Sequence, residues 1–504
     1  MSKKQSGAVL TLVSVDKQSK VQLFRQLETQ LRNAILAGSL TGGTRLPSSR
    51  ALASELGVSR PTVVLVLERL AGEGFLEARH GAGTFVASVM PQHLPRTMQV
   101  PQANQPSVGA FRPETGTFKL SRTGARFAAI KANIEVSDRR PFLPNAPAYD
   151  KFPFALWQTC ANRRARQSFQ SGMGYTDPAG YAPLKRAIAD YLALHRGDHC
   201  DPEQIVITPG GHAAFMIAAL LLTDPGDRLL FEDPGPVITR NLFESLDRKI
   251  VHTPVDDDGM DFEQIVQKVP RLRMAFTMPS RHHPLGKTLS LARRFRLMDW
   301  AQANDAWIIE DDYDSEFRYT GRPLPSMRSI DKSGRVLYVG TFSKALFPAL
   351  RVGYFVLPPA LVPVFRNAMA LMFRSVPLTT QMVLADFIAE GHFSTHLRRM
   401  RELYTHRRRD FIETAAEVSE GNFEIDSPDS GMNAIAWLPK GVSDTQVHAK
   451  AVERGIHCYP LSDYCARPYQ RDALVLGFTS VQSHQLRPGL EALSQLISAE
   501  RRGL

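Results

Sequence analysis

Apolar residues near the start of the chain recur at helical spacing in three short segments. The first occupies residues 21–36 and is followed by Gly38, a natural helix stop. The second begins after Ser48 or Ser49 and ends at Gly57. The third follows Ser59, a good N-cap residue, and tolerates a proline in its first turn. This spacing predicts three consecutive helices.

Two short apolar stretches, residues 75–79 and 84–86, follow the third helical segment. The intervening His80-Gly81-Ala82-Gly83 is typical of a turn, so the stretches predict a β-hairpin. A helix, a tight turn, a second helix and this hairpin predict a winged helix-turn-helix domain at residues 15–87. From residue 88 to about 135 the apolar period disappears and Pro and Gln accumulate, which is typical of a linker.

From about residue 136 to the end, candidate strands and helices alternate, which predicts an α/β domain over residues 136–504. A chain of 504 residues has room for two or three folding units. Its longest apolar helical run, residues 215–222, is much shorter than the ~20 residues of a membrane span. The N-terminus lacks a signal-peptide core, and the four cysteines lack paired spacing. We therefore expect a cytoplasmic protein without a metal site or a membrane anchor.

The charge balance favours polyanionic partners. The chain carries 61 Lys and Arg against 50 Asp and Glu, a net charge of +11. Arg45, Arg50 and Arg60 lie at loop ends and helix starts of the predicted winged helix, where arginines can reach phosphates and base edges. A small helical bundle of another function is the alternative, and the charge placement favours DNA binding.

Lys344 directly follows an apolar strand candidate, residues 336–339. Open α/β sheets present ligand-facing groups at this end of a strand. Thr341 and Ser343 supply hydroxyls and Arg351 supplies a guanidinium, a set suited to holding a phosphate beside an amine. Lysine amines form Schiff bases with carbonyl compounds, and pyridoxal phosphate carries an aldehyde and a phosphate. Lys344 is therefore a candidate pyridoxal-phosphate lysine rather than an ordinary loop lysine.

Two other strand ends fit the same ligand. A strand candidate ends in Gly210-Gly211 and opens a helix, whose free N–H groups and dipole can bind phosphate. Another strand candidate runs into Asp311-Asp312-Tyr313, where one acid can pair with a pyridine nitrogen and the phenol can donate to the ring oxygen. Because Asp311 and Lys344 end successive strands of one expected sheet, both should open on one crevice.

The segment RLPSSRALASELGVSRPTVVLVLERLAGEGFLEARHGAGTFV, residues 45–86, resembles the winged-helix domain of GntR-type bacterial transcription regulators. The resemblance implies binding to operator or promoter DNA. Val64 departs from relatives that read bases strongly through an arginine, so the operator sequence stays open. The DNA-facing positions that the resemblance implies, in addition to Arg45, are Arg50, Ser59, Arg60, Thr62, His80 and Gly81.

From about Arg140 to its end the chain resembles fold-type I aminotransferases. The resemblance implies that Lys344 forms an aldimine with the cofactor, that Asp311 pairs with the pyridine nitrogen and that Tyr313 is the phenol donor. Both halves together resemble the MocR/GabR-type regulators, which implies a homodimer in which a winged helix can lie on the partner's large domain. The implied phosphate contacts are Gly210, Gly211, His212, Thr341, Ser343 and Arg351.

Three positions depart from the aminotransferase pattern. Pro236 stands where relatives place an aromatic residue that stacks on the cofactor ring. His283 stands where aminotransferases have an asparagine, so either it substitutes or that hydrogen bond is absent. Val475 aligns with the arginine that clamps the substrate carboxylate.

The sequence predicts a transcription regulator that binds DNA and senses an amino compound, or pyridoxal phosphate itself, through Lys344. Coupling between two such sites needs a ligand that binds two arrangements of the protein unequally. A working aminotransferase is the alternative, and the missing carboxylate arginine favours the sensor. A regulator without a cofactor is a third possibility.

Overall fold

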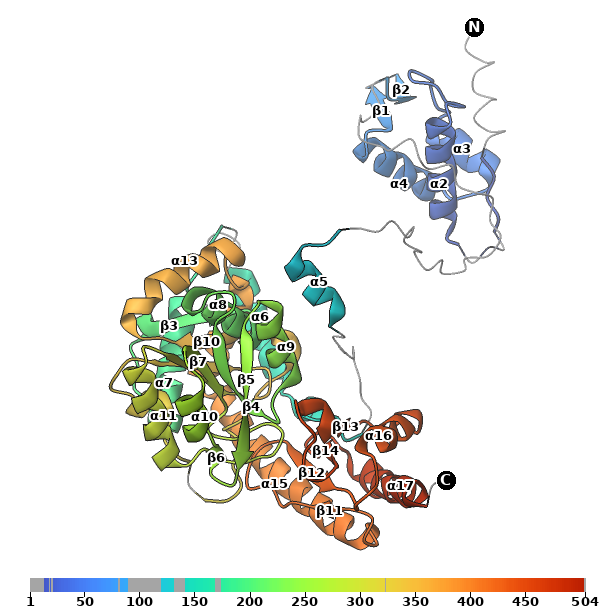
Figure 1. Ribbon diagram of the computed structural model, residues 1–504. Coiled ribbons are helices and arrows are strands. Elements are labelled where there is room, and N and C mark those ends of the chain that lie inside the picture. The colour runs from blue at the N-terminus through green and yellow to red at the C-terminus, as the bar shows by residue number, and fades with distance from the viewer. Residues whose placement is uncertain are drawn as a thin grey trace. The chain divides into compact units, whose positions relative to one another are not determined.

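A computed structural model describes residues 13–17, 19, 21–79, 82–88, 119–130, 141–167, 174–321 and 323–502. The chain divides into two compact units, Met1–Gly116 and Thr117–Leu504 (Figure 1). Within the described residues, no helix is both long enough and apolar enough to cross a membrane.

The N-terminal unit contains the predicted three helices and hairpin. Ser48 caps α3 by accepting from the Ala51 N–H, and Gly57 ends this helix with a positive φ of 61°. Ser59 caps α4 in the same way by accepting from Thr62. The elements are α2 (Leu23–Leu36), α3 (Ser49–Leu56), α4 (Arg60–Gly72), β1 (Leu76–Arg79) and β2 (Gly83–Val86).

Burial of one face of each helix holds this unit together. Leu27, Leu31, Val63, Val66 and Leu70 are fully buried in a single apolar cluster. The strands β1 and β2 pair antiparallel with Leu76 opposite Val86. The winged-helix prediction is confirmed at the level of fold.

The large lobe of the second unit is built on an eight-stranded mixed sheet with the order β3-β10-β9-β8-β7-β4-β5-β6. Strands β4, β5, β7, β8 and β9 are mutually parallel, whereas β10 runs antiparallel to both β3 and β9. The strands are β3 (Ile205–Thr208), β4 (Arg228–Asp233), β5 (Lys249–Asp256), β6 (Gly259–Met260), β7 (Leu272–Thr277), β8 (Trp307–Asp312), β9 (Val336–Thr341) and β10 (Gly353–Val356).

Helices surround this sheet, as the alternation of elements predicts. They are α6 (Phe154–Gln167), α7 (Ala182–Arg196), α8 (Gly211–Leu222), α9 (Val237–Ser245), α10 (Glu263–Lys268), α11 (Leu291–Ala303), α12 (Met327–Ile330), α13 (Val362–Met372) and α14 (Leu378–Ala389). Short 3₁₀ helices lie at Tyr149–Lys151, Pro202–Gln204, Pro348–Leu350, Pro359–Leu361 and Leu461–Tyr464.

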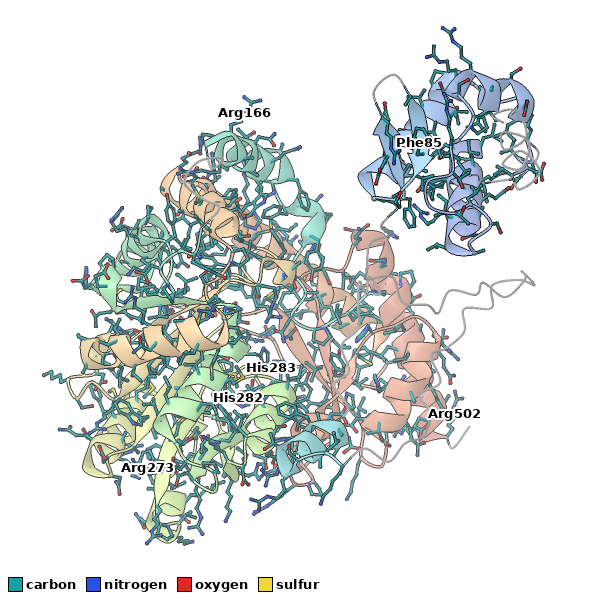
Figure 2. The ribbon with its side chains drawn as sticks, turned by 90° about the horizontal axis from the view of Figure 1, so that it is seen from above. Phe85, Arg166, Arg273, His282, His283 and Arg502 are labelled. Atoms are coloured by element: carbon teal, nitrogen blue, oxygen red, sulfur yellow. The ribbon has the colours of Figure 1, made fainter. Side chains whose placement is uncertain are left out.

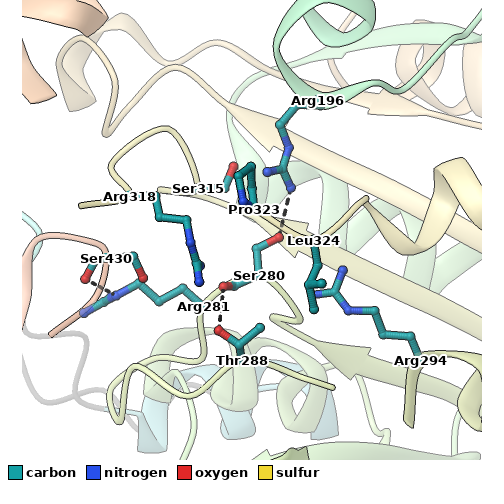
Figure 3. Close-up of a pocket in the computed structure, with 10 residues that line it drawn as sticks. All are labelled: Arg196, Ser280, Arg281, Thr288, Arg294, Ser315, Arg318, Pro323, Leu324 and Ser430. Carbon is teal, nitrogen blue, oxygen red and sulfur yellow. Dashed lines mark hydrogen bonds between the residues drawn. The ribbon is translucent and has the colours of Figure 1, made fainter. Parts of the chain in front are cut away.

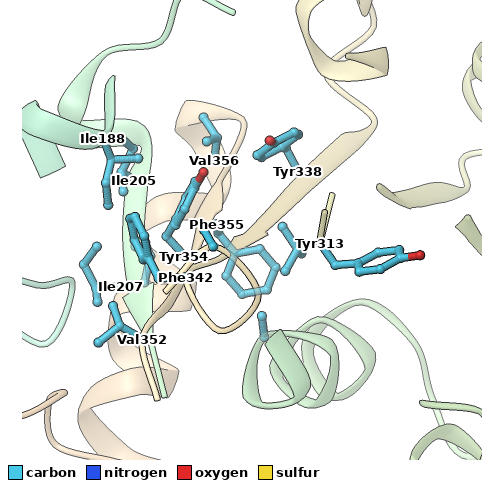
Figure 4. Packing of buried hydrophobic residues seen from close by; sticks show 14 of the residues in the cluster. Ile188, Ile205, Ile207, Tyr313, Tyr338, Phe342, Val352, Tyr354, Phe355 and Val356 are labelled. Atoms are coloured by element: carbon cyan, nitrogen blue, oxygen red, sulfur yellow. The ribbon is translucent and has the colours of Figure 1, made fainter. Parts of the chain in front are cut away.

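Aromatic packing fixes the turn that carries Lys344 (Figure 4). The Tyr354 ring lies so close to Gly340 that a Cβ there would approach its Cζ to 2.3 Å. Phe342 packs against Tyr354 with the ring centroids 5.7 Å apart. Any side chain at residue 340 would therefore displace the end of β9 from β10.

The small lobe is a four-stranded sheet with the order β11-β12-β14-β13, in which the paired strands are antiparallel. Its strands and helices are β11 (Glu424–Ile425), β12 (Asn433–Trp437), β13 (Tyr459–Pro460), β14 (Ala473–Gly477), α16 (Asp444–Glu453) and α17 (Ser483–Arg501).

Helix α15 (His392–Val418) joins the two lobes. Its first half contributes Leu397, Met400 and Tyr404 to the large-lobe core, and its second half contributes Phe411 to the small-lobe core. The basic residues of this helix thus belong to an amphipathic helix that connects the two lobes.

A helix that the sequence analysis missed, α5 (Arg122–Ala129), lies within the interval 88–135 expected to be a linker. Ser121 caps it by accepting from Gly124, and Arg126 donates to Asp247 at 2.6 Å. Residues 89–118 and 131–140 of that interval lie outside the described residues.

Candidate functional site

Three consecutive acids end β8, and their side chains alternate across the sheet. Glu310 accepts from the backbone N–H groups of Met327 and Arg328, at 2.8 and 2.9 Å. On the same face, Asp312 accepts from the Tyr338 hydroxyl at 2.5 Å and pairs with a guanidinium at 2.9 Å. Asp311 points to the other face, where it has no hydrogen bond to any described residue.

The Asp311 carboxylate is half-buried, and its neighbours oppose its charge. Burial first, and then the charges of Asp312, Asp314 and Glu232, raise its pKa well above the usual value, while Lys344 acts in the opposite sense. A positively charged or N–H donor placed beside Asp311 would lower this raised pKa, and no described residue supplies a hydrogen bond of this kind.

Lys344 lies in the turn after β9, the strand next to β8. Its Nζ donates to the Asn145 carbonyl at 3.2 Å. Burial lowers the pKa of its amine, and the charges of Asp314 and Asp311 partly oppose this shift. A lowered pKa increases the uncharged fraction, which is the form that attacks a carbonyl group.

The N-terminus of α8 opens toward the end of β9. Its N-cap Gly210 has a φ of 89° and supplies no side-chain cap, so the first N–H groups of the helix stay available for a ligand. Gly353 pairs with both Thr208 and Thr341, and a Cβ there would approach the Gly210 carbonyl carbon to 2.9 Å. Glycine at residue 353 therefore allows these elements to converge.

Hydroxyl and guanidinium groups complete this helix start. The Thr341 hydroxyl lies 3.1 Å from that of Ser343 and accepts from the Ser343 N–H at 3.2 Å. Arg351 donates to the Pro209 carbonyl at 2.9 Å, and its guanidinium would lie 3.3 Å from a Cβ on Gly210. The grouping of helix dipole, hydroxyls and cation is suited to a phosphate.

His212 lies on the first turn of α8 and is exposed. Partial loss of hydration, followed by the charges of Arg351 and Lys344, lowers its pKa to about 4. The imidazole is therefore neutral at physiological pH, and positive charge at this helix start comes from Arg351 and Lys344.

Tyr313 directly follows β8, and its hydroxyl accepts from Arg281 at 2.9 Å. The same hydroxyl donates to Asp314 and thereby lowers the pKa of that acid, so the predicted donation to a cofactor ring oxygen would replace this hydrogen bond. Arg281 also donates to Asp314 at 3.1 Å and to the carbonyls of Ser430 and Asn433. Arg281 was not singled out from the sequence, and its position beside His282-His283-Pro284 was the available signal.

His283 stands where aminotransferases have an asparagine, and it supplies a polar atom at that position. It is buried inside the large unit (Figure 2), and its Nδ1 has no hydrogen-bond partner among the described residues. Its ring packs edge-on against Tyr313 and Tyr464, with centroids 6.1 and 5.1 Å away. Burial, followed by the charges of Arg281 and other neighbours, holds its pKa well below the usual value.

The other two departures have apolar or structural surroundings. Pro236 is half-buried and forms the N-cap of α9. Val475 is fully buried on β14, opposite Ile435, in an apolar cluster that includes Leu461 and Tyr464. The Val475 side chain therefore offers no positive charge to the carboxylate of a bound substrate.

Asn145 and Asn433, which were also missed in the sequence, link the small lobe to Lys344. The Asn145 N–H donates to the Asn433 side chain at 2.6 Å, and the Asn433 amide donates back at 2.7 Å. Since the Asn145 carbonyl accepts from Lys344, β12 is connected to the candidate lysine through a single residue.

The predicted DNA-facing arginines of the N-terminal unit are exposed. No ion pair with a described residue involves Arg45, Arg50 or Arg60. By contrast, Arg32 and Arg69 are both paired with Glu28. Unpaired guanidinium groups at helix starts stay available to phosphates.

The remaining predicted DNA-facing positions divide into two groups. The Ser59 and Thr62 hydroxyls lie 2.7 Å apart at the start of α4, so Ser59 also has a capping role. His80 and Gly81 lie outside the described residues.

Comparisons with known proteins match both units. Residues 145–471 match the family described as aminotransferase class I and II, and residues 23–86 match the bacterial regulatory proteins of the gntR family. The chain is 38% identical over 493 residues to the probable rhizopine catabolism regulatory protein MocR of Rhizobium meliloti, covering 98% of this chain and 97% of that protein.

Two further comparisons extend this picture. The HTH-type pyridoxine biosynthesis transcriptional regulator PdxR of Corynebacterium glutamicum is 29% identical over 475 residues, with 94% of this chain and 95% of that protein covered. The crystal structure of the multiple substrate aminotransferase from Thermococcus profundus superposes with a TM-score of 0.68 at 25% identity, over 76% of this chain and 98% of that one. The chain therefore belongs to the MocR-type subfamily of GntR regulators, in which a gntR-type winged helix precedes an aminotransferase class I and II domain.

Proposed function

We propose that this protein is a transcription regulator that binds DNA through its N-terminal unit and binds pyridoxal phosphate in the crevice between Asp311 and Lys344. The single observation that carries the proposal is the unused hydrogen-bonding capacity of this crevice. Asp311 and the Nδ1 of His283 have no described partner, and the start of α8 has no side-chain cap. Membership of a gntR-type family with an aminotransferase domain supports the same conclusion.

The residues present fit pyridoxal phosphate. Asp311 would hold a proton on the pyridine nitrogen, and Tyr313 or His283 would contact the ring oxygen. The start of α8 with Thr341 and Arg351 would hold the phosphate. When bound, the cofactor supplies an aldehyde that condenses with amines.

The signal molecule is an amino compound or pyridoxal phosphate itself. An amine that competes with Lys344 would change the hydrogen bond from its Nζ to Asn145, and hence the contact between Asn145 and Asn433 on β12. The crevice is thus linked to the position of the small lobe, which is the kind of two-state element that a sensor needs. The name of PdxR associates that relative with pyridoxine biosynthesis, which supports the cofactor itself as the signal.

The alternative function is a working aminotransferase. Val475 argues against it, because its position in an apolar cluster supplies no carboxylate clamp. We expect no steady conversion of amino acids with oxo-acid acceptors. Sustained turnover combined with the absence of salt-sensitive binding to the protein's own promoter DNA would support the enzyme instead.

Cofactor binding is tested by visible absorbance of the full-length protein titrated with pyridoxal phosphate. We expect a saturable visible band that Lys344→Ala abolishes. Lys249→Ala, at an exposed lysine that begins β5, is the matched control and should keep the band. A wild-type protein without any band at saturating cofactor would contradict the proposal.

DNA binding is tested by mobility shift or anisotropy with the protein's own promoter DNA over a range of salt concentrations. Any amine that shifts the cofactor spectrum should change the affinity for this DNA. We also propose a homodimer, which light scattering of the purified protein measures directly.

A further inference from the structure

A cavity beside the Asp312 face of the large-lobe sheet is lined by four arginines, and none of its described lining residues carries a carboxylate (Figure 3). About 290 Å³ of space lies among its lining residues when the part open to solvent is included, and about 10 Å³ of it can hold the centre of a water-sized molecule. Its polar lining comprises chiefly Arg196, Arg281, Arg294, Arg318, Ser280 and Ser315. The Asp311 side chain lies on the opposite face of β8. Arg281 lines the cavity and also reaches the candidate cofactor site through its hydrogen bond to Tyr313.

Two of these arginines help to hold the fold. Arg294 donates to the carbonyls of Leu289, Pro325 and Pro279. Arg281 donates to Tyr313, Asp314 and two backbone carbonyls, as described above. Each guanidinium nitrogen of these two residues donates at least one hydrogen bond, and their positive charge stays at the cavity wall.

The other two arginines have unused donors. The side chain of Arg196 is 5% exposed, forms an ion pair with Asp312 and donates to the Ser280 hydroxyl, but its Nε has no partner among the described residues. The buried Nε of Arg318 also lacks a partner, and no side-chain hydrogen bond to a described residue involves Arg318. In Figure 3 its guanidinium points into the group of lining residues without a dashed line. Buried charged donors left in this state are costly, so an acceptor is expected.

The charges around the cavity leave a positive surplus. Asp312 pairs with Arg196, and Asp314 pairs with Arg281, whereas no described ion pair involves Arg294 or Arg318. Two further acids, Glu310 and Glu316, lie nearby, but burial raises the pKa of each to about 7. They therefore offset this surplus only in part at neutral pH.

We propose that this cavity binds a small inorganic oxyanion of the phosphate type. The fork of Arg318 and the free Nε of Arg196 are the principal donors, and the Ser315 hydroxyl lies beside them. Arg318 also pairs through its backbone with Ser430, in the loop before β12, and Arg281 donates to the Ser430 carbonyl at 2.9 Å. A bound anion would therefore hold the large lobe against the small lobe.

The test is calorimetric titration of the full-length protein with inorganic phosphate, at an ionic strength held constant with potassium chloride. We expect a saturable component that Arg318→Gln weakens at least tenfold. Arg398→Gln, at an exposed arginine on α15 that does not line the cavity, is the matched control and should leave it unchanged. Arg351→Gln separates this site from the start of α8 and should also leave the component intact.

Because Arg318→Gln breaks no side-chain hydrogen bond or ion pair with a described residue, this variant should fold, and its unfolding temperature without phosphate verifies that it does. Phosphate should raise the unfolding temperature of the wild type and of Arg318→Lys more than that of Arg318→Gln. The proposal is overturned if phosphate binding is not saturable, if Arg318→Gln binds as tightly as the wild type, or if Arg351→Gln abolishes the whole signal.

Discussion

Replacing Asp311 by asparagine should weaken cofactor binding and stabilise the cofactor-free protein, two effects of opposite sign. In the cofactor-free protein the carboxylate accepts no hydrogen bond from a described residue, so its removal breaks no such bond. With pyridoxal phosphate bound, the variant loses a charge-assisted hydrogen bond, worth about 1.5–3 kcal/mol. The dissociation constant should therefore rise about ten- to hundredfold.

The stabilising effect depends on pH in a defined direction. Burial and three neighbouring acids raise the pKa of Asp311 in the folded protein, so ionisation opposes folding. The advantage of Asp311→Asn in the free energy of unfolding should be absent below the ordinary carboxyl pKa and should grow as the pH rises above it.

Two assays measure these effects on the same preparations. Absorbance titration gives the dissociation constant for pyridoxal phosphate, and denaturant unfolding of the cofactor-free protein at pH 4 and pH 7.5 gives the stability difference. Asp299→Asn, at an exposed acid on α11, is the control for a change of surface charge. Unchanged cofactor affinity, or a cofactor-free variant less stable than the wild type at pH 7.5, would refute the reasoning.

Three further predictions concern other parts of the protein. Arg60→Ala should weaken binding to promoter DNA and reduce the slope of log affinity against log salt by about 1, measured by anisotropy; an unchanged slope would show that Arg60 contacts no phosphate. Asp312→Asn should lower the free energy of unfolding by about 3–5 kcal/mol, because it leaves Arg196 buried without its ion pair; denaturant unfolding measures this, and a loss below about 1 kcal/mol would contradict it. Burial lowers the pKa of His396 to about 4, so between pH 6.5 and 4 the wild type should lose up to about 3 kcal/mol of stability relative to His396→Gln; parallel stability curves over that range would argue against a buried neutral imidazole.

Local signals in the sequence were sufficient for the winged helix. Ser48 and Ser59 cap their helices and Gly57 ends one in the left-handed region, as predicted. These features depend on residues within one helical turn, so they can be predicted without knowledge of the tertiary fold. Helix α5 was missed because its eight residues lie in a Pro- and Gln-rich context and none of them is buried.

The candidate site was only partly predictable, because its members come from distant positions. Asp311 and Lys344 follow strands of one sheet, and the rule for strand ends was enough to expect them near each other. Arg281 could not be found in this way, since its four acceptors come from two loops and a strand of the other lobe. The paired amides of Asn145 and Asn433 could not be predicted either, because the two residues are 288 positions apart in the sequence.

The sequence alone was enough to predict the order of the two units, the three helices and hairpin of the first, the alternation of strands and helices in the second, and the residue types at three strand ends. Hydrophobic period and capping chemistry act over short distances, so these features need no knowledge of the tertiary fold. Only the tertiary structure decided which of these groups are satisfied. It joined Asp312 to Arg196 and left Asp311 without a partner, although the two acids are adjacent and chemically identical. The physical reason is that alternate residues of a strand face opposite sides of the sheet, and the long-range packing of each side determines which charge is paired and which stays available for a ligand.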